Sequence, residues 1–208
     1  MSIFINTINE NNQVHPVYKT QYGEIHTPFY FINEMLDCFS DEIFKNSETK
    51  WLDIGAGRGN FSIVLYQKLY NSLVEVIPDN EKRKKHIIKK MIFMIEVNPE
   101  NIRILKFTFG KYANIIYNDF LTCNLPFQPN IIIGNPPFNI NGQIKVPTNQ
   151  LSCKKQDGKN AWCPFIQKCL HILPKDGLLN VIIPSIWMKP DKAKMYDLLL
   201  SYKITKLK

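Results

Sequence analysis

A short apolar segment at residues 130–134 ends in a polar side chain, two prolines and an aromatic ring. These four residues are Asn135, Pro136, Pro137 and Phe138. Apolar runs bounded by such breakers are typical of buried parallel strands, and open α/β sheets bind ligands beyond the carboxyl ends of those strands. Prolines lack a backbone donor, so nearby carbonyls stay free to accept hydrogen bonds, while Asn135 adds an acceptor and Phe138 a stacking face. The segment predicts a pocket for a planar ring with an exocyclic amino group.

Glycine recurs at alternate positions after Asp53, between a strand expected at about 51–54 and a helical pattern. The glycines are Gly55, Gly57 and Gly59. Glycine lets the backbone approach a ligand closely, and the N-terminus of the following helix favours polar or anionic groups. A dinucleotide fingerprint would need glycine at position 60, which is Asn60. The spacing instead resembles the S-adenosylmethionine turn of Rossmann-like methyltransferases.

Acidic side chains follow the next two predicted strands. Glu96 ends a strand expected at 91–96, and a carboxylate there can accept hydrogen bonds from both ribose hydroxyls of a nucleotide. It lies 37 residues after the glycine turn, beyond the usual separation of about twenty, because a basic insertion at 78–90 intervenes. Glu75 stands nearer that distance and remains a competitor. Asp119 follows a strand near 113–117 and can accept from an adenine amino group, with Phe120 beside it as an apolar contact.

Alternating strands and helices predict an α/β fold with a mostly parallel sheet and helices on both faces. The strands are expected at 51–54, 91–96, 113–117, 130–134, 178–183 and 203–207, and helices after Thr27, after Gly59, and at 98–110, 164–173 and 191–200. Thr27 is expected to cap its helix, with Pro28 as the first helical residue. Irregular segments are expected at 1–20 (a polar arm), 41–50 (a charged loop), 78–90 (a solvated insertion) and 139–160 (a polar loop). Because the last strand stands at the C-terminus, we expect a closing antiparallel strand to be missing.

Length and composition predict one domain and a polyanionic partner. The 208 residues suffice for a single α/β domain, which we place at 21–208. The net charge of +8 suits nucleic acid, although a chain rich in Lys, Asn and Ile is also typical of AT-rich genomes. Five irregularly spaced cysteines predict reduced thiols and no metal site, and the histidines, His26 among them, are expected to be ordinary surface or packing residues. Without a long apolar run or a signal pattern, we expect a soluble, intracellular (cytoplasmic) protein with no membrane partner.

Taken together, the motifs resemble those of the N6-adenine DNA methyltransferases, in the subgroup that places cofactor motifs first and target recognition last. The resemblance spans about residues 20 to 207. It rests on the catalytic tetrapeptide at 135–138, the glycine motif at 53–59, the acidic motif at Glu96, the adenine-contacting motif at Asp119 and Phe120, the segment 23–28 that packs over the methionine part of the cofactor, and framework motifs at 162–173 and 176–184.

The resemblance implies S-adenosyl-L-methionine as the cofactor and an adenine flipped out of duplex DNA as the substrate. The Asn135 side-chain oxygen and a carbonyl near Pro136 would accept the two N–H groups of adenine N6, Phe138 would stack on the base, and the methyl group would be displaced in line. Lysines at 145, 154, 155 and 159 could meet phosphates or belong to a solvated loop. No target recognition domain follows, so a separate recognition subunit or a missing C-terminal domain is expected to supply specificity.

Other functions share parts of this pattern. Protein-glutamine methyltransferases of the release-factor type share the tetrapeptide, usually with Tyr at the fourth place, but carry a helical domain before the glycine turn, where this chain has only about fifty residues. Ribosomal RNA adenine methyltransferases commonly have an aliphatic residue where Pro136 stands. A truncated DNA-binding remnant that keeps the pocket without activity is the non-catalytic alternative.

Overall fold

The computed structural model describes residues 16–138, 161–190 and 194–207. Within them, five strands form one sheet in the order β3-β2-β1-β4-β5, and every neighbouring pair is parallel. The strands are β1 (Trp51–Ile54), β2 (Ile92–Glu96), β3 (Asn114–Tyr117), β4 (Ile131–Gly134) and β5 (Leu178–Val181). The predicted α/β fold with a parallel sheet is confirmed. The strand order reverses between β1 and β4, which places a crevice at their carboxyl ends.

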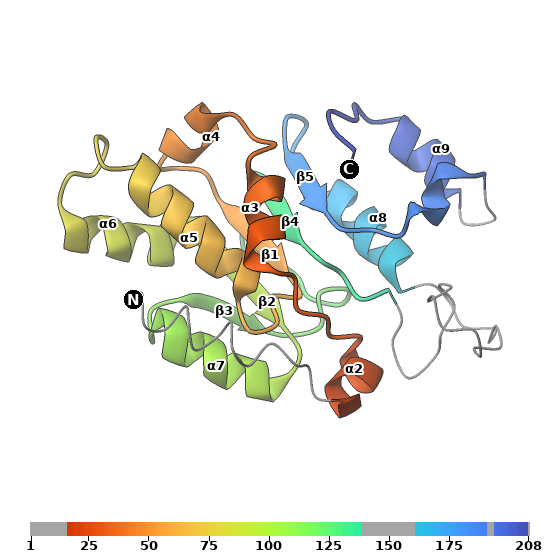
Figure 1. The fold of residues 1–208 in the computed structure, drawn as a ribbon, viewed down its shortest axis with the longest axis horizontal. Coiled ribbons are helices and arrows are strands. Elements are labelled where there is room, and N and C mark those ends of the chain that lie inside the picture. The colour runs from red at the N-terminus through yellow and green to blue at the C-terminus, as the bar shows by residue number, and fades with distance from the viewer. Residues whose placement is uncertain (1–15, 139–160, 191–193, 208) are drawn as a thin grey trace.

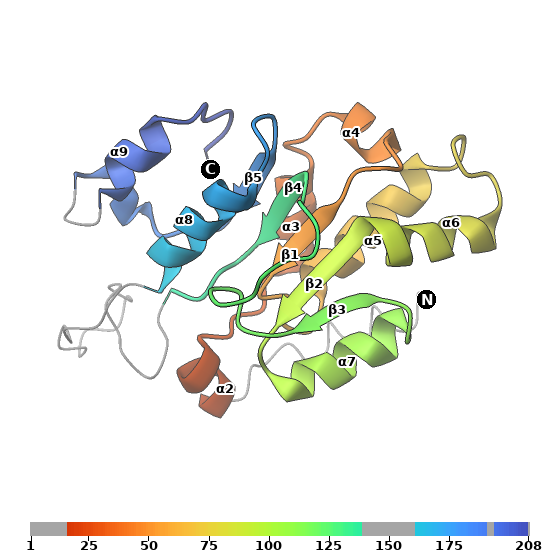
Figure 2. The same ribbon diagram turned by 180° about the vertical axis from the view of Figure 1, so that it is seen from behind.

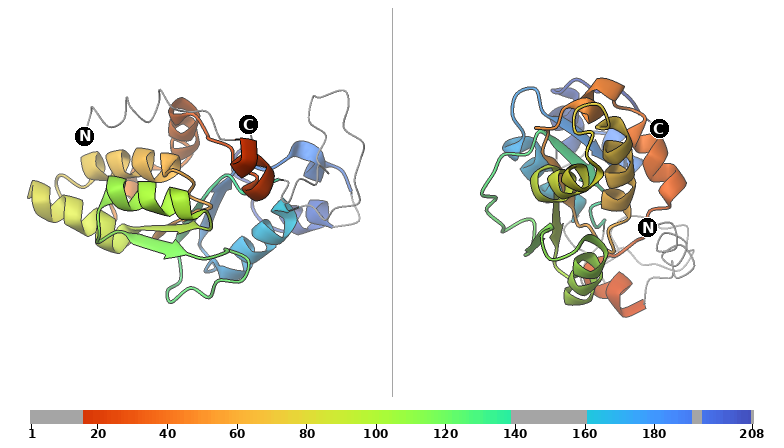
Figure 3. Two further views of the ribbon diagram at one scale, coloured as in Figure 1. Left: turned by 90° about the horizontal axis from the view of Figure 1, so that it is seen from below. Right: turned by 90° about the vertical axis from the view of Figure 1, so that its left-hand side faces the viewer.

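Helices cover both faces of the sheet, as Figures 1 and 2 show. They are α2 (Pro16–Tyr22), α3 (Phe29–Leu36), α4 (Asp41–Lys45), α5 (Asn60–Ser72), α6 (Asn80–His86), the π-helix η1 (Ile87–Met91), α7 (Pro99–Phe109), α8 (Trp162–Ile172), the 3₁₀-helix η2 (Ser185–Met188) and α9 (Met195–Leu200). Seen from below in Figure 3, α5 and α7 lie on one side of the strands and the loop after β3 lies on the other. Helix α8 packs on that second side.

Strands β1 and β4 are fully buried, and apart from Asp53 their sequences are apolar. In β1, Trp51 packs into the core under α3 and α5, whereas Leu52 and Ile54 pack into the core under α8. In β4, Ile131 and Ile133 face the first core and Ile132 the second. Successive side chains of a strand point to opposite faces, so an unbroken apolar run is what a doubly covered parallel strand needs. This pattern explains why the first five strands were predicted at the right places.

The predicted boundaries of helix α7 are confirmed by its caps. The Asn98 side chain accepts a hydrogen bond from the Glu100 backbone N–H at 3.0 Å, and Pro99 follows at the first helical position. At the other end Gly110 adopts a φ of 80°, which favours glycine. Helix α7 follows strand β2 closely, and its two ends are set by capping residues that can be recognised in the sequence.

The segments expected to be irregular contain short helices instead. Residues 16–22 form α2, so the polar arm expected at 1–20 is wrong from residue 16 onward, and α2 crosses the predicted domain boundary. Residues 41–45 of the expected charged loop form α4, in which Phe44 is buried. Helices of five to seven residues show little apolar periodicity in the sequence, and whether they form depends mainly on tertiary packing.

The insertion at 78–90 is helical, and more than half of its residues are exposed as expected of a solvated segment, but Arg83 and Ile87 are buried. Asp79 caps α6 by accepting from the Lys82 backbone N–H at 2.8 Å. Arg83 is only 3% exposed, donates to the carbonyls of Ile77 and Pro78, and lies 4.3 Å from the Tyr70 ring. Because Arg83 stands in a run of charged residues, its burial was not predicted. Its contact with Tyr70 packs the insertion against α5.

Several boundaries differ from the predictions. Pro28 is the N-cap of α3, with no side-chain cap bond, so Thr27 is not the cap. Helix α8 begins at Trp162, two residues before the predicted start. Residues 203–207 form no strand, so the predicted sixth strand is wrong. The loop at 139–160 with its lysines lies outside the described residues, as do residues 1–15 of the arm and 191–193 of the last predicted helix.

Candidate active site

A pocket lies at the carboxyl ends of β1, β2 and β4, next to the place where the strand order reverses. Side chains and backbone from six segments of the chain surround it. They are Tyr22–Thr27, Gly55–Arg58 with Asn60 and Phe61, Ile95–Val97, Asn118–Phe120, Asn135 with Pro137, and Phe165. Parallel strands end at the same edge of a sheet, which is why residues so distant in sequence meet here.

The glycine turn holds the backbone in conformations that other residues rarely adopt. Gly57 has a φ of 56° and Gly59 a φ of 92°. A Cβ added at Gly59 would lie 2.8 Å from Leu105 Cδ2 and 3.0 Å from Phe109 Cε2, whereas one at Gly57 would meet nothing within 4 Å. Gly59 therefore allows α7 to pack against the start of α5, and Gly57 leaves the turn open toward the pocket.

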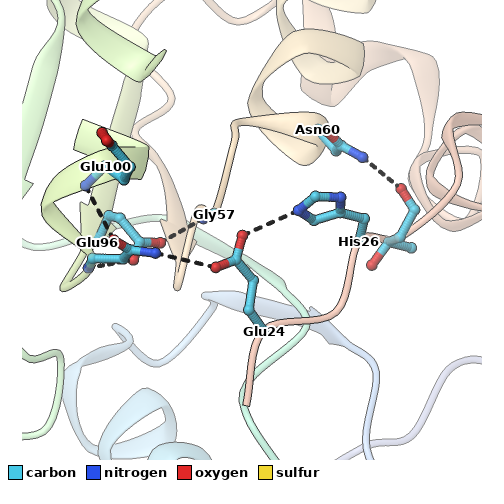
Figure 4. A network of polar contacts seen from close by, with 8 residues as sticks. Glu24, His26, Gly57, Asn60, Glu96 and Glu100 are labelled. Carbon is cyan, nitrogen blue, oxygen red and sulfur yellow. Dashed lines mark hydrogen bonds and ion pairs between the residues drawn. The ribbon is translucent and has the colours of Figure 1, made fainter. Parts of the chain in front are cut away.

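Glu96 ties this turn to the start of α7. One carboxylate oxygen accepts from the Gly57 backbone N–H at 2.6 Å, and the other accepts from the N–H groups of Val97 and Asn98 at 2.9 and 2.7 Å. Burial raises the pKa of Glu96 above its ordinary value, although the N–H bonds from Asn98 and Gly57 work against that rise. Its competitor Glu75 is exposed and does not line the pocket. Figure 4 shows Glu96 facing Gly57.

Asp53 lies behind the turn and does not line the pocket. It is 1% exposed and accepts from the Ser62 hydroxyl at 2.7 Å, while its second oxygen has no hydrogen-bond partner among the described residues. Burial raises the pKa of Asp53 to about 7, and the nearby charge of Glu96 adds to the rise. Asp53 thus joins β1 to the first turn of α5 rather than presenting a free carboxylate to the pocket.

The segment before α3 closes one side of the pocket with a buried acid and a histidine. Glu24 Oε1 lies 3.1 Å from His26 Nε2, and Glu24 Oε2 accepts from the Asn98 side-chain amide at 3.3 Å (Figure 4). Burial raises the pKa of Glu24, but hydrogen bonds from His26, Asn101 and Asn98 and the charge of His26 hold it below its ordinary value. His26 therefore lines the pocket instead of being an ordinary surface or packing residue.

Thr27 connects this segment to two other walls of the pocket. Its carbonyl accepts from the Asn60 side-chain amide at 2.9 Å, and its hydroxyl accepts from Asn135 Nδ2 at 3.3 Å. Pro28 follows as the cap of α3 and does not line the pocket. The sequence motifs placed Thr27 near the site but gave no sign of the partnership with Asn60, because that contact spans 33 residues.

The tetrapeptide after β4 contributes only part of its residues to the pocket wall. Asn135 and Pro137 line the pocket, whereas Pro136 is buried. Phe138 is half-buried and packs against the cluster that contains Trp162 and Trp187. The amide is therefore the polar group that this strand end presents to a ligand.

The loop after β3 adds an aromatic floor. Phe120 is 3% exposed and its ring centroid lies 5.3 Å from that of Phe165 on α8. Asp119 is exposed, and its side chain accepts from the Leu121 backbone N–H at 2.9 Å. Both residues line the pocket together with Asn118, Arg58 and the N-terminal segment. Sequence reasoning did not single out Arg58 or Asn118, although Arg58 lies between two glycines of the glycine motif and Asn118 directly precedes Asp119.

Within the described residues, no group of three or more His, Cys, Asp and Glu side chains could hold a metal ion. Across the same ranges, the helices are too short or too polar to span a bilayer.

The fold defined by this sheet is the Rossmann-like fold of class I methyltransferases. The structure is similar to the M protein of the type I restriction enzyme EcoKI, with a TM-score of 0.58 and 19% identity over 86% of this chain and 37% of that one. It is also similar to the DNA-bound type ISP restriction-modification enzyme LlaBIII, with a TM-score of 0.60 and 13% identity over 93% of this chain and 17% of that one. At these identities the similarity concerns the fold.

Residues 61–207, more than half of the chain, match the model of the Eco57I restriction-modification methylase family, and the chain belongs to that family. Over 75 residues it is 37% identical to an adenine-specific methylase of Mycoplasma pneumoniae, covering 35% of this chain and 18% of that protein. Over 164 residues it is 24% identical to the tRNA1(Val) (adenine(37)-N6)-methyltransferase of Aliivibrio fischeri, covering 76% of this chain and 62% of that protein. The chain thus spans less than two thirds of each relative. The resemblance drawn from the motifs is confirmed.

Proposed function

We propose that this chain transfers a methyl group from S-adenosylmethionine to the N6 amino group of adenine in DNA. The observation that carries the proposal is a single pocket lined by both Glu96 and Asn135. The first residue stands beside a glycine turn of the kind that receives a nucleoside, and the second presents an amide at the neighbouring strand end. A cofactor and an amino group can therefore meet across one crevice.

The residues around the glycine turn fit the cofactor. Glu96 accepts one N–H at Oε2 and two at Oε1, and a carboxylate offers about four acceptor sites, so one remains for a ribose hydroxyl. We assign the adenine end to Asp119 and Phe120. The segment with Thr27 and Pro28 would cover the methionine end. The cofactor supplies an activated methyl group when bound, and these residues hold and orient it.

The amide of Asn135 is assigned to the substrate. The lone pair of an adenine amino group is delocalised into the ring, and acceptors for its N–H groups draw that pair back onto nitrogen. Asn135 Oδ1 and a carbonyl near Pro136 are the proposed acceptors, and the half-buried Phe138 ring is the proposed stacking face for a flipped base. Positioning and preoriented acceptors would supply most of the rate, because this arrangement needs no strong base.

Duplex DNA is the proposed partner, and recognition of a sequence is assigned to another subunit or to a further domain. The chain covers 37% of the EcoKI M protein, which is part of a type I restriction enzyme. The net charge of +8 supports binding to a phosphate backbone.

Adenine N6 methylation in RNA is the second candidate. The tRNA methyltransferase of Aliivibrio fischeri matches 76% of this chain, more than the 35% matched by the adenine-specific methylase of Mycoplasma pneumoniae. The sequence identity to the tRNA methyltransferase is lower, at 24% against 37% for the adenine-specific methylase. The match to a restriction-modification methylase family favours DNA as the substrate.

The test offers the purified chain tritiated S-adenosylmethionine with duplex DNA, transfer RNA and a release factor in parallel reactions. We expect label on DNA, and loss of that label with Asn135→Ala. Label on transfer RNA alone would establish the second candidate. Label on the release factor alone would overturn both and point to glutamine methylation.

A further inference from the structure

Three walls of the pocket meet at Thr27. This residue is 5% exposed, its carbonyl accepts from the Asn60 side chain at 2.9 Å, and its hydroxyl accepts from Asn135 Nδ2 at 3.3 Å. Asn60 is the first residue of α5, and Asn135 directly follows β4. Thr27 thus links the N-terminal segment to a helix start and to a strand end that lies 108 residues away.

The bond to Thr27 occupies the NH₂ end of the Asn135 amide. An asparagine amide has an accepting oxygen at one end and a donating NH₂ group at the other. When Nδ2 is engaged by Thr27, the oxygen is left for a ligand that donates. In the reversed orientation the NH₂ group would face the amino group of a substrate, and two donors would oppose each other. The Thr27 hydroxyl can donate as well as accept, so a substrate that donates selects the orientation in which the amide oxygen faces it, and Thr27 then holds the NH₂ end.

Asn60 holds Thr27 in place for this task. The side chain is 5% exposed and donates through Nδ2 to the Thr27 carbonyl, while its Oδ1 has no hydrogen-bond partner among the described residues. The unpaired, buried Oδ1 of Asn60 is unfavourable for stability. The favourable contribution of this side chain is therefore the hydrogen bond that its Nδ2 donates to Thr27. Because α5 packs into the core through Phe61, Val64 and Leu65, Asn60 is anchored to a rigid element.

We propose that Thr27 and Asn60 are positioning residues for Asn135. Thr27 accepts from Nδ2 and holds the amide in place while its oxygen receives the incoming amino group, and Asn60 fixes the backbone of Thr27 against α5. The inference rests on the proposed function and assigns the Thr27 hydroxyl to Asn135 rather than to the cofactor.

The direct test is nuclear magnetic resonance of the side-chain amides in the ¹⁵N-labelled full chain. The Asn135 amide pair is identified by its loss in Asn135→Ala. Thr27→Val keeps the shape of the side chain and removes the hydroxyl, so we expect that pair to shift and to exchange faster with solvent. Thr27→Ser keeps the hydroxyl and should leave the pair in place. An unchanged pair in Thr27→Val would overturn the proposal, and this test requires no activity.

The kinetic test separates positioning from cofactor binding. In single turnovers on duplex DNA at saturating cofactor, Thr27→Val should slow methyl transfer by about 10-fold or more. The Kd for the cofactor analogue sinefungin should stay within about 3-fold of the value for the original chain. Thr27→Ser should restore the rate. Asn60→Ala should give a smaller loss in the same direction. Loss of sinefungin affinity equal to the loss of rate would place the hydroxyl on the cofactor and overturn the inference. Absence of transfer by the unmodified chain would count against the proposed function, and the resonance test would still decide the inference.

Discussion

The glycine-turn half of the pocket and the half at the end of β4 differ in how far their polar groups are already paired. In the first half, Glu96 accepts three backbone N–H groups and Glu24 is bonded to His26 and Asn98. In the second half, the Asn135 side chain has one hydrogen bond among the described residues, to Thr27 at 3.3 Å. The first half is rigid before a ligand arrives, whereas the second presents an acceptor that a ligand completes.

Strand β4, which carries Asn135, is as buried as β1, but it lies next to a less buried edge strand. Every residue of β1 is buried, while every residue of β5, at the edge beside β4, is only half-buried. The centre of the sheet therefore fixes the glycine turn through packing together with the hydrogen bond from Gly57 to Glu96. The β4 side depends more on specific polar contacts such as the Thr27 hydrogen bond. This comparison gives four predictions, taken from the largest expected effect to the smallest.

Removing the amide should abolish chemistry without disturbing the first half. Asn135→Ala should slow methyl transfer by about 10³-fold, because the acceptor for the amino group is lost. The Kd for sinefungin, measured by calorimetry, should stay within about 2-fold. Equal loss of cofactor affinity would contradict the division of the pocket into two halves.

Removing the Glu96 carboxylate should mainly weaken binding of the cofactor analogue, the property that Asn135→Ala should leave unchanged. Glu96→Ala should weaken sinefungin binding by about 10- to 100-fold, since hydrogen bonds to a charged acceptor are worth more than neutral ones. Glu75→Ala is the matched control, because Glu75 is exposed and outside the pocket. A comparable loss in the control would show that Glu75 is the ribose ligand. Thermal melting of both variants checks that they are folded.

The glycine turn should respond to added methyl groups unequally. Gly59→Ala should lower the free energy of unfolding by about 2 to 3 kcal/mol, because its Cβ would crowd Leu105 and Phe109 and its φ is 92°. Gly57→Ala should cost about 1 kcal/mol from its positive φ alone. Urea denaturation measures both. Equal values would mean that the packing of α7 against the turn contributes nothing.

Asp53 should make stability depend on pH. Its pKa is raised from 3.8 to about 7, so its contribution to stability is fully present below pH 3.8 and is lost as the pH rises through 7. Asp53→Asn should therefore exceed the original chain in stability by about 1 to 2 kcal/mol at pH 8, and the gain should shrink toward pH 5. Denaturation at both pH values tests this, and a gain that is constant with pH would contradict it.

Much of the fold was predictable because its strands are continuous apolar runs between clear breakers. Asn98 and Gly110 even fixed the ends of α7. The incorrect predictions arose where long-range packing overrides the local sequence pattern. Arg83 is an example, because it is buried although it stands in a basic stretch of the sequence. The strand predicted at 203–207 is also wrong, since a strand exists only where a neighbour supplies ladder hydrogen bonds, and Thr205 and Leu207 instead line a groove beside β5.

The site was predictable where it stands at strand ends. Glu96 and Asn135 each directly follow or end a strand, and the geometry of parallel sheets brings such positions together. The partnership of Asn60 with Thr27 and that of His26 with Glu24 could not be read from spacing. Both depend on how a segment without regular structure lies across the sheet edge, and only the three-dimensional arrangement gives that.

The central claim is that the Asn135 amide activates an adenine amino group for a methyl donor held beside Glu96. The most direct measurement incubates duplex DNA with the chain and S-adenosylmethionine that carries a trideuterated methyl group, followed by digestion and mass spectrometry of the nucleosides. We expect trideuterated N6-methyladenine as the labelled product, and no such product with Asn135→Ala. Label on cytosine, or label on adenine that persists in Asn135→Ala, would contradict it.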